Sequence, residues 1–287
     1  IYINGNGDYI MEKLKNIYEK VQTIISKIAG DEIGIYAAQA SFFLMISAIP
    51  FLLLCFTVIK SFINIDLQTF IHTINSYAPP QVSMFLTTII NELFSKASNA
   101  PVISISAVTT LWLASKGVMA LFTGLNRIYN APEKNYFYRR SMSLIYTLIF
   151  IAALILTILF FGFGNRIEEI LSRKYYIISV IFSLFLELKT VIFVIYLTLI
   201  FALFYRFLPK YQNKFSHQLP GALFSAIGWM VFSHIYSIYI ENYSNYSYVY
   251  GSVAAIVFLM LWLYFCMNIF LYGARFNKFL EKRFFKK

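Results

Sequence analysis

Lys116 is the residue whose type and position most strongly suggest chemistry, because it interrupts a long apolar run. It lies in the segment 112–117 (WLASKG), a few residues past the midpoint of a stretch that is long enough to cross a membrane. A charged side chain at that depth costs about 3 kcal/mol, so its presence favours a site that attracts an anion. The structural alternative is that the long aliphatic stem carries the ammonium group to the membrane interface.

The residue patterns of common enzymes do not occur in this sequence. There is no HExxH motif, no phosphate-binding loop, no GxSxG motif and no paired-cysteine motif. The three histidines, at positions 72, 217 and 234, are scattered, and Cys55 and Cys266 lie in separate apolar runs. We therefore expect a protein that is not an enzyme and that has no metal site, no disulfide and no cofactor.

Long apolar stretches are the elements that must position these side chains. Of the 287 residues, 59% are hydrophobic and 13% are charged, a balance that suits lipid better than water. A helix needs about 20 apolar residues to cross the hydrocarbon core. Six stretches meet this length, at residues 37–59, 102–124, 142–164, within 176–204, 219–240 and 249–273. The sequence thus predicts an all-α polytopic membrane protein with about six transmembrane helices, whose membrane domain covers residues 37–273.

The fourth stretch has two interpretations, because Glu187 and Lys189 interrupt it. Residues two apart point to different faces of a helix and cannot pair well. In the preferred interpretation the span covers 190–208, both charges lie at the outer interface, and 176–186 is a shallow or re-entrant segment. In the other interpretation the helix is centred near residue 188, and Glu187 lies deep enough to neutralise Lys116.

Basic residues alternate between the connectors, which predicts the orientation of the chain. Seventeen of the 24 Lys and Arg residues lie in the N-terminal segment, the second and fourth connectors and the C-terminal tail, against five in the other connectors. Basic flanks stay in the cytoplasm, so both termini are expected there. The segregation also accounts for the net charge of +11 without a nucleic-acid partner.

Three segments outside the expected spans complete the predicted domain organisation. Within the N-terminal segment 1–36, residues 13–28 have the pattern of an amphipathic helix, which lies on the inner membrane surface or packs across the ends of the spans. Residues 65–96 carry two short apolar stripes separated by Pro79 and Pro80, which predicts a helical hairpin on the outer face. Residues 274–287 are expected to be a basic cytoplasmic tail.

Small residues in the fifth stretch predict close packing of its helix against a neighbour. They are Gly221, Ala222, Ser225 and Gly228. The Tyr-rich segment that joins the fifth and sixth stretches is typical of an interfacial aromatic belt, with contact to lipid headgroups or to a glycan as the alternative.

A set of short motifs recurs in order along the chain. They are ASFF at 40–43 with Ser47 and Pro50, LW at 111–112 with Gly117, LN at 125–126, YRFLP at 205–209, PG at 220–221 with Trp229, YGS at 250–252, LWLY at 261–264 and GA at 273–274. Each motif is modest, but the ordered set resembles the YihY/virulence factor BrkB family over roughly residues 30–280.

The resemblance implies a bacterial inner-membrane protein with six spans. Some members of this family carry the label ribonuclease BN, which the sequence does not support because it lacks metal ligands and a soluble catalytic domain. Family members are linked to envelope phenotypes and to lipid or lipopolysaccharide export. This chain departs from the family where Arg275 follows Gly273 and Ala274, because an acidic residue is usual there; a role for that carboxylate is not expected here.

We expect a transporter-like protein that moves or accommodates a lipid or an amphipathic anion. Its partners would be membrane lipids, including an anionic lipid or a lipid-linked substrate. Lys116 and Gln39 are placed in a cavity between the first, second and fifth spans. The further candidates for substrate binding are Trp112, Ser115, Asn126, Trp229, His234 and Glu187.

Two alternatives remain open at this point. A non-catalytic scaffold would recruit envelope partners through the outer hairpin and the Tyr-rich loop. An intramembrane lipid enzyme would need Glu187, His234 and Lys116 to converge on one pocket.

Overall fold

The described residues are almost entirely helical, which confirms the predicted all-α class. The computed structural model describes residues 32–63, 67–77, 83–84, 86–88, 90–91, 100–132, 135–162, 164, 188–209, 214–242, 246–281 and 283. The helices are α2 (Ile33–Ile63), α3 (Leu67–Tyr77), α5 (Ala100–Tyr129), α6 (Tyr136–Thr157), the π-helix η1 (Ile158–Gly162), α9 (Lys189–Phe207), the 3-10 helix η2 (Phe215–Gln218), α10 (Leu219–Asn242) and α11 (Tyr246–Leu280).

Within the described residues, five helices are long and apolar enough to cross a membrane. These candidate spans are Ser104–Tyr129, Tyr136–Phe160, Lys189–Phe207, Phe215–Glu241 and Ala254–Leu280. The first expected span corresponds to α2, in which the apolar stretch Ile33–Ala48 is shorter than a full span. α2 itself has 31 residues and contains Pro50, whose ring removes a backbone hydrogen bond and bends a helix. The expected set of about six spans is therefore confirmed for five helices.

Observed helix boundaries differ from the predicted ones mainly at the polar ends. α9 begins at Lys189 and so matches the expected span 190–208, not a helix centred near residue 188. α5 continues to residue 129 and α11 to residue 280, beyond the predicted 124 and 273. An apolar run marks the lipid-contacting part of a helix, whereas the last turns continue into the interface. The expected segments 13–28 and 176–186, and Glu187, lie outside the described residues.

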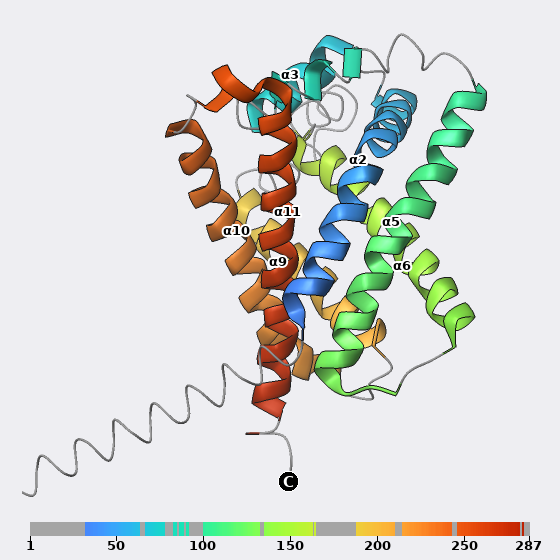
Figure 1. The fold of residues 1–287 in the computed structure, drawn as a ribbon, viewed down its shortest axis with the longest axis vertical. Helices are drawn as coiled ribbons and strands as arrows, with labels where there is room; N and C mark the ends of the chain where they lie inside the picture. Colours follow the sequence, from blue (N-terminus) through green and yellow to red (C-terminus); the bar gives the residue numbers. More distant parts are fainter. Residues whose placement is uncertain are drawn as a thin grey trace, which may run out of the picture.

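The long helices stand side by side and form one bundle (Figure 1). α2 packs on α5 and α11, α10 packs on α9 and α11, and α6 packs on α5. The start of α2 and the end of α11 lie at the same end of the bundle, and α3 lies at the opposite end (Figure 1). We call the former the basic end, because Arg127, Arg206 and Arg275 lie in the last two turns of the helices that end there.

Glycines allow α10 and α11 to approach closely. A Cβ added at Gly221 would collide with the backbone oxygen of Gly273, and a Cβ at Gly273 would collide with Ser225 Oγ. The Ser225 hydroxyl donates to the backbone oxygen of Ile269 on α11 (2.9 Å) and lies 2.9 Å from the Tyr205 hydroxyl on α9. These contacts confirm the close packing that the small residues of this helix predicted.

A buried polar network joins helix ends at the basic end. Gln218 Oε1 accepts hydrogen bonds from the Tyr129 hydroxyl (2.7 Å) and from Asn277 Nδ2 (3.1 Å). Asn277 Oδ1 accepts from the backbone N–H of Gly221 (2.6 Å). Because these four residues come from α5, η2, α10 and α11, the network ties the ends of those elements together.

The end of α5 is capped twice. Asn130 has φ 51°, a left-handed conformation that Asn tolerates, and the N–H of Ala131 donates to the backbone oxygen of Asn126 (2.9 Å). The ammonium group of Lys278 on α11 donates to the backbone oxygen of Ile128, which a helix end leaves without a helical partner. Lys278 is therefore buried in the bundle, although the sequence assigned it to a cytoplasmic tail.

α3 and the residues that follow it contact each other. Asn75 Oδ1 accepts from the hydroxyls of Ser83 and Thr87, with a distance of 3.2 Å for Thr87. Ile71 and Ile90 are both buried. A helical hairpin requires contacts of this kind, and the residues that would form its turn, 78–82, lie outside the described part.

Candidate functional site

Lys116 lies at the middle of the candidate span Ser104–Tyr129, deeper than the sequence placed it. Its side chain is partly buried, and Nζ lies 5.2 Å from the centre of the Phe43 ring on α2. Gly117 allows the two helices to meet here, because a Cβ at that position would lie only 3.1 Å from the backbone oxygen of Ala40. The ammonium group therefore sits at the contact between α2 and α5, over an aromatic ring.

Gln39 shares one face of α2 with Phe43, because the two residues are four apart. Its side chain is exposed on the outside of the bundle. Phe43, which Lys116 contacts, lies one turn of α2 from Gln39. Gln39 and Lys116 therefore lie on the same side of the α2–α5 pair. Both lie on an outward-facing surface.

Arg140 brings a second cation to this side of the molecule. It lies in the second turn of α6 and is only 9% exposed. Its Cζ atom is 4.1 Å from the centre of the Trp112 ring on α5. Trp112 is 54% exposed, lies four residues before Lys116 on the same helix face, and is closer to the middle of its span than to either end. The guanidinium group therefore reaches well away from the basic end.

Several polar atoms on α6 have no hydrogen-bond partner among the residues that the structure describes. They are Arg140 Nε and Nη2, Arg139 Nε and Ser143 Oγ, and all four are buried. In the part of the chain that the structure describes, no carboxylate pairs with Arg140 or Lys116, and each cation instead contacts an aromatic ring. Buried polar groups in folded proteins are almost always hydrogen-bonded, so a cluster of exceptions within one helical turn requires an explanation.

α6 presents its polar residues to the bundle and its apolar residues to the outside. Its buried residues are Arg140, Ser143, Thr147 and Ile151, which recur at helical spacing on one face. Large apolar side chains such as Leu148 are exposed on the other side. A membrane helix with this arrangement directs its polar face to a protein-lined or water-filled path.

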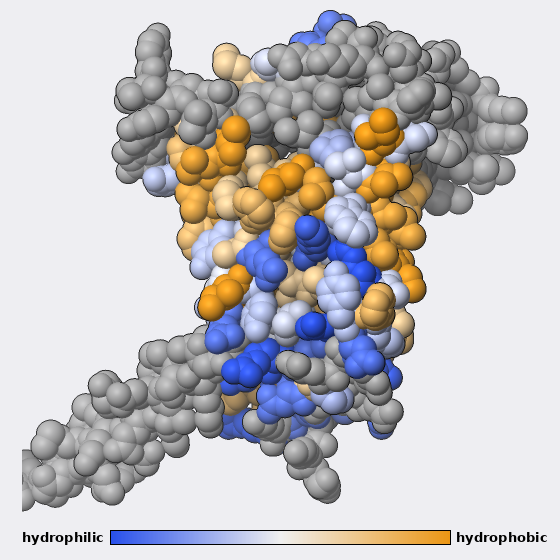
Figure 2. Space-filling model, turned by 45° about the vertical axis from the view of Figure 1, so that its right-hand side comes forward, coloured by the Kyte–Doolittle hydropathy of each residue, from blue (hydrophilic) through white to orange (hydrophobic). Residues whose placement is uncertain are grey.

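Hydrophilic surface extends deep into this side of the bundle. Viewed from the side of α5 and α6, it reaches from the lower part of the molecule to about mid-height, between hydrophobic areas on both flanks (Figure 2). We use the term polar face for the residues of α2, α5 and α6 described above, namely Gln39, Trp112, Lys116, Arg139, Arg140 and Ser143.

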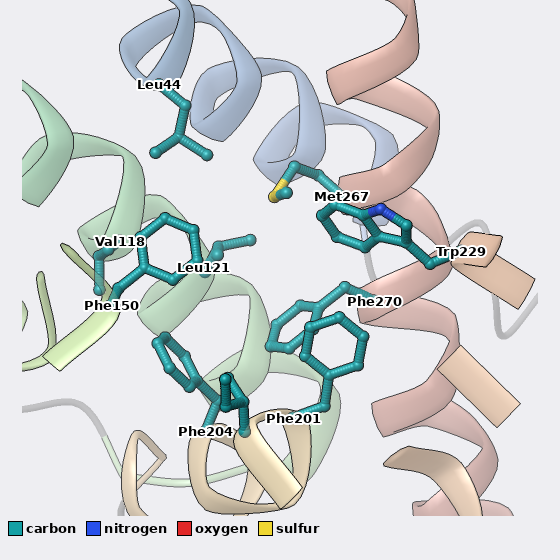
Figure 3. A pocket seen from close by; sticks show the side chains of 10 residues that line it. Leu44, Val118, Leu121, Phe150, Phe201, Phe204, Trp229, Met267 and Phe270 are labelled. Carbon is teal, nitrogen blue, oxygen red and sulfur yellow. The ribbon is translucent and has the colours of Figure 1, made fainter. Parts of the chain in front are cut away.

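An apolar pocket lies in the interior of the bundle (Figure 3). Its volume is about 410 Å³ including the space at its mouth, and six helices contribute to its wall. Lining residues, one from each helix in chain order, are Leu44, Val118, Phe150, Phe204, Trp229 and Phe270. Its described lining includes neither Lys116 nor Gln39 and carries no charged side chain. The pocket suits hydrocarbon and not a headgroup.

Ser115 and Asn126, two further predicted binding residues, are both buried in α5. The Ser115 hydroxyl donates to the backbone oxygen of Trp112 (2.8 Å), so it is satisfied within its own helix. Asn126 Oδ1 has no hydrogen-bond partner in the described chain, and Asn126 lies near the basic end of α5. Neither side chain adds a donor to the polar face.

The remaining predicted residues lie elsewhere. Trp229 lines the apolar pocket, where its ring meets the ring of Trp262 edge-on at 5.9 Å. His234 is exposed on α10, which packs on α9 and α11, so the structure does not bring it together with Lys116. Glu187 lies outside the described residues. The residues that the sequence placed in a single cavity are thus divided between the polar face, the interior apolar pocket and other parts of the bundle.

Comparison with known proteins agrees with this architecture. The family model described as Virulence factor BrkB matches residues 24–287. The chain belongs to the BrkB family. It is 25% identical over 248 residues to a ribonuclease-like protein, YfkH, of Bacillus subtilis, covering 86% of this chain and 90% of that protein. It is 24% identical over 281 residues to a UPF0761 membrane protein of Photobacterium profundum, covering 96% of this chain and 85% of that protein. No solved structure matches it.

These matches confirm the family resemblance of the sequence motifs and identify an integral, multi-pass membrane protein with bacterial relatives. The sequence prediction for this BrkB-family chain did not include Arg139, Arg140 or Ser143. The positive-inside count treats both arginines as connector charges, because they precede the third apolar run. Helical spacing is the signal that could have found them, since Arg140, Ser143 and Thr147 fall on one face of a helix that begins at Tyr136.

Proposed function

We propose that this BrkB-family protein is a transporter-like protein of the bacterial inner membrane that binds an anionic lipid at the polar face and gives its headgroup a path into the bilayer. Lys116 and Arg140 carry this proposal, because Lys116 lies at the middle of a candidate span, Arg140 reaches Trp112 of the same helix, and both cations contact aromatic rings in place of carboxylates among the described residues. In the proposal α2 also crosses the membrane, which brings the number of spans to six, and the basic end faces the cytoplasm.

Two cations packed against membrane helices are costly when no anion accompanies them. A cation over an aromatic ring gains about 2 kcal/mol when it is desolvated. Removing a charged group from water costs several kcal/mol, so the aromatic contacts do not offset the loss. An anionic group near Lys116 and Arg140 would supply the missing attraction, which supports a negatively charged ligand.

Sideways access favours a lipid over a soluble anion. Trp112 is largely exposed, and the outer side of α6 exposes Ile145 and Leu148. The polar face is therefore bordered by surface that suits hydrocarbon (Figure 2). A lipid can keep its tails in the bilayer there while its headgroup contacts the cations, as an intramembrane polar path requires.

Protein reconstituted into liposomes with a fluorescent phosphatidylglycerol tests this proposal. The measured quantity is the rate at which the labelled lipid moves between leaflets. Lys116→Ala is expected to lower that rate about tenfold, because a loss of about 1.4 kcal/mol of headgroup attraction along the path raises the barrier by that amount. Lys189→Ala is the matched control: it removes one positive charge from an exposed position at the start of α9 and should leave the rate unchanged.

A folded Lys116→Ala protein that moves the lipid as fast as the wild type would contradict the proposal. If deletion of residues 65–96 then abolished the cellular function while lipid movement persisted, the scaffold hypothesis would be favoured instead.

A further inference from the structure

We infer that Arg140, Arg139 and Ser143 form a subsite for the phosphate group of an anionic phospholipid, an inference that rests on the proposed function and names the class of anion. Three side chains within about one turn of α6 place buried polar atoms together, and none of those atoms has a partner among the described residues. Arg140 is 9% exposed and Ser143 is fully buried, so the unmet donors are held inside the structure.

The two unpartnered nitrogens of Arg140 lie on one edge of its guanidinium group. Nε and Nη2 point their N–H groups in nearly parallel directions, which is the fork that binds two oxygens of a phosphate or a carboxylate. An edge with one unmet nitrogen would suit a water molecule. An edge with both nitrogens unmet matches a bidentate oxyanion.

Trp112 fixes the orientation of that edge. Arg140 Cζ lies over the Trp112 ring, 4.1 Å from its centre. A contact of this kind restrains an arginine side chain without using its N–H groups as hydrogen-bond donors. The Arg140 fork is therefore preorganised, which lowers the entropy lost when a ligand binds.

Ser143 differs from several other helical hydroxyls of this bundle. The hydroxyls of Ser41, Ser115, Thr123 and Thr147 each donate to a backbone oxygen three or four residues earlier in their own helix. Ser143 makes no such bond although it has the same helical backbone oxygens within reach. Its hydroxyl is thus kept available, one turn along α6 from the two arginines.

The arrangement favours phosphate over carboxylate. Arg139 and Arg140 are neighbours and leave the helix about 100° apart, whereas Ser143 lies about one turn further on. Donors that approach from different directions suit the tetrahedral oxygens of a phosphate better than the planar pair of a carboxylate.

Binding of dioctanoyl phosphatidylglycerol to the full chain in detergent, titrated and followed by native mass spectrometry, tests the subsite. Arg140→Lys keeps the charge but loses the fork, so the affinity should fall about tenfold, or about 1.4 kcal/mol. Ser143→Ala removes a hydroxyl that bonds nothing in the described protein, so it should weaken binding about threefold while the thermal midpoint stays unchanged. Ser41→Ala is the matched control and should leave the affinity unchanged, because its hydroxyl is satisfied within α2.

Dioctanoylglycerol, which has the same tails without the phosphate, should bind at least about tenfold more weakly than the phospholipid. Equal binding of these two lipids would overturn the subsite, as would wild-type affinity in both Arg140→Lys and Ser143→Ala. Inorganic phosphate that competed as strongly as the phospholipid would overturn the lipid assignment, since the tails would then contribute nothing.

The two proposals fail separately. If Lys116→Ala slows lipid movement but Arg140→Lys binds phosphatidylglycerol normally, the phosphate subsite is wrong and the transport function stands. If Arg140→Lys loses affinity but lipid movement in liposomes does not depend on Lys116, the subsite stands and the transport function is wrong.

Discussion

Arg140 and Lys278 show two uses of a basic side chain within one bundle. Lys278 is buried and donates to the backbone oxygen of Ile128. Its positive charge thus lies at the C-terminal end of α5, where it interacts favourably with the partial negative charge of the helix dipole. Arg140 is similarly buried, but its guanidinium group lies over the ring of Trp112 and leaves Nε and Nη2 without a hydrogen-bond partner among the described residues. The first side chain is committed to the fold, whereas the second keeps hydrogen-bonding capacity for a ligand.

At the residue scale, Tyr129→Phe tests the buried network of the basic end. The Tyr129 hydroxyl donates to Gln218 Oε1 at 2.7 Å, and its removal is expected to lower the free energy of unfolding by about 1–2 kcal/mol. The measurement is the thermal unfolding midpoint in detergent. Tyr272→Phe, at an exposed position on α11, should leave the midpoint unchanged. Equal midpoints for the two variants would show that the network does not hold the helix ends.

At the element scale, α6 and α10 make opposite kinds of contact. α10 meets α11 through glycines, so the two backbones nearly touch and leave no room for adjustment. α6 meets α5 through a face of arginine and hydroxyl side chains, several of them without partners in the described chain. The α10–α11 pair is therefore the rigid part of the bundle, and the α5–α6 contact is the part with unmet polar interactions.

Gly273→Ala tests the rigidity of the α10–α11 pair. The added methyl group would collide with Ser225 Oγ and the backbone oxygen of Gly221, so the variant is expected to lose about 3 kcal/mol or more of stability. The measurements are the yield of folded protein and its thermal midpoint. Gly228→Ala is the control, because its nearest neighbour, at 3.1 Å, is a methyl carbon of Ile269 that can move. A Gly273→Ala protein as stable as Gly228→Ala would contradict the close approach.

At the scale of the whole molecule, the bundle has two different ends. The start of α2 and the end of α11 lie together at the basic end, and α3 lies at the other (Figure 1). If these two helix ends lie on one side of the membrane, an even number of crossings separates them, which agrees with the proposal that α2 crosses in addition to the five candidate spans of the described residues.

Cysteine accessibility tests this arrangement in cells. After Cys55 and Cys266 are replaced by alanine, single cysteines at Glu32 and Arg283 should react with a membrane-impermeant maleimide from the same side of the membrane. A single cysteine at Ser76, exposed on α3, should react from the opposite side. If the cysteines at positions 32 and 283 reacted from opposite sides of the membrane, the shared location of the two helix ends would be contradicted.

The positions of the helices could be predicted from the sequence because a run of about 20 apolar residues has few alternatives to a spanning helix. Lys116 could be found for the same reason, since one charge interrupts such a run. Arg140 was missed, because a basic residue just before an apolar run has the pattern of an ordinary connector charge, and only its helical spacing to Ser143 and Thr147 indicates a buried face. The hydrogen bond between Asn277 and Gln218 could not be predicted from the sequence, because 59 residues separate the two partners. Neither helix on its own indicates what these side chains contact.

A hydrogen bond from Tyr196 on α9 holds one end of α6. The Tyr196 hydroxyl donates to the backbone oxygen of Ala153 at 2.6 Å, near the end of α6 that is remote from the arginines. Near the other end, the guanidinium group of Arg140 on α6 contacts the ring of Trp112 on α5. Arg140 thus joins α6 to α5 with the same side chain that would bind the phosphate, so a headgroup bound there would bridge two neighbouring helices.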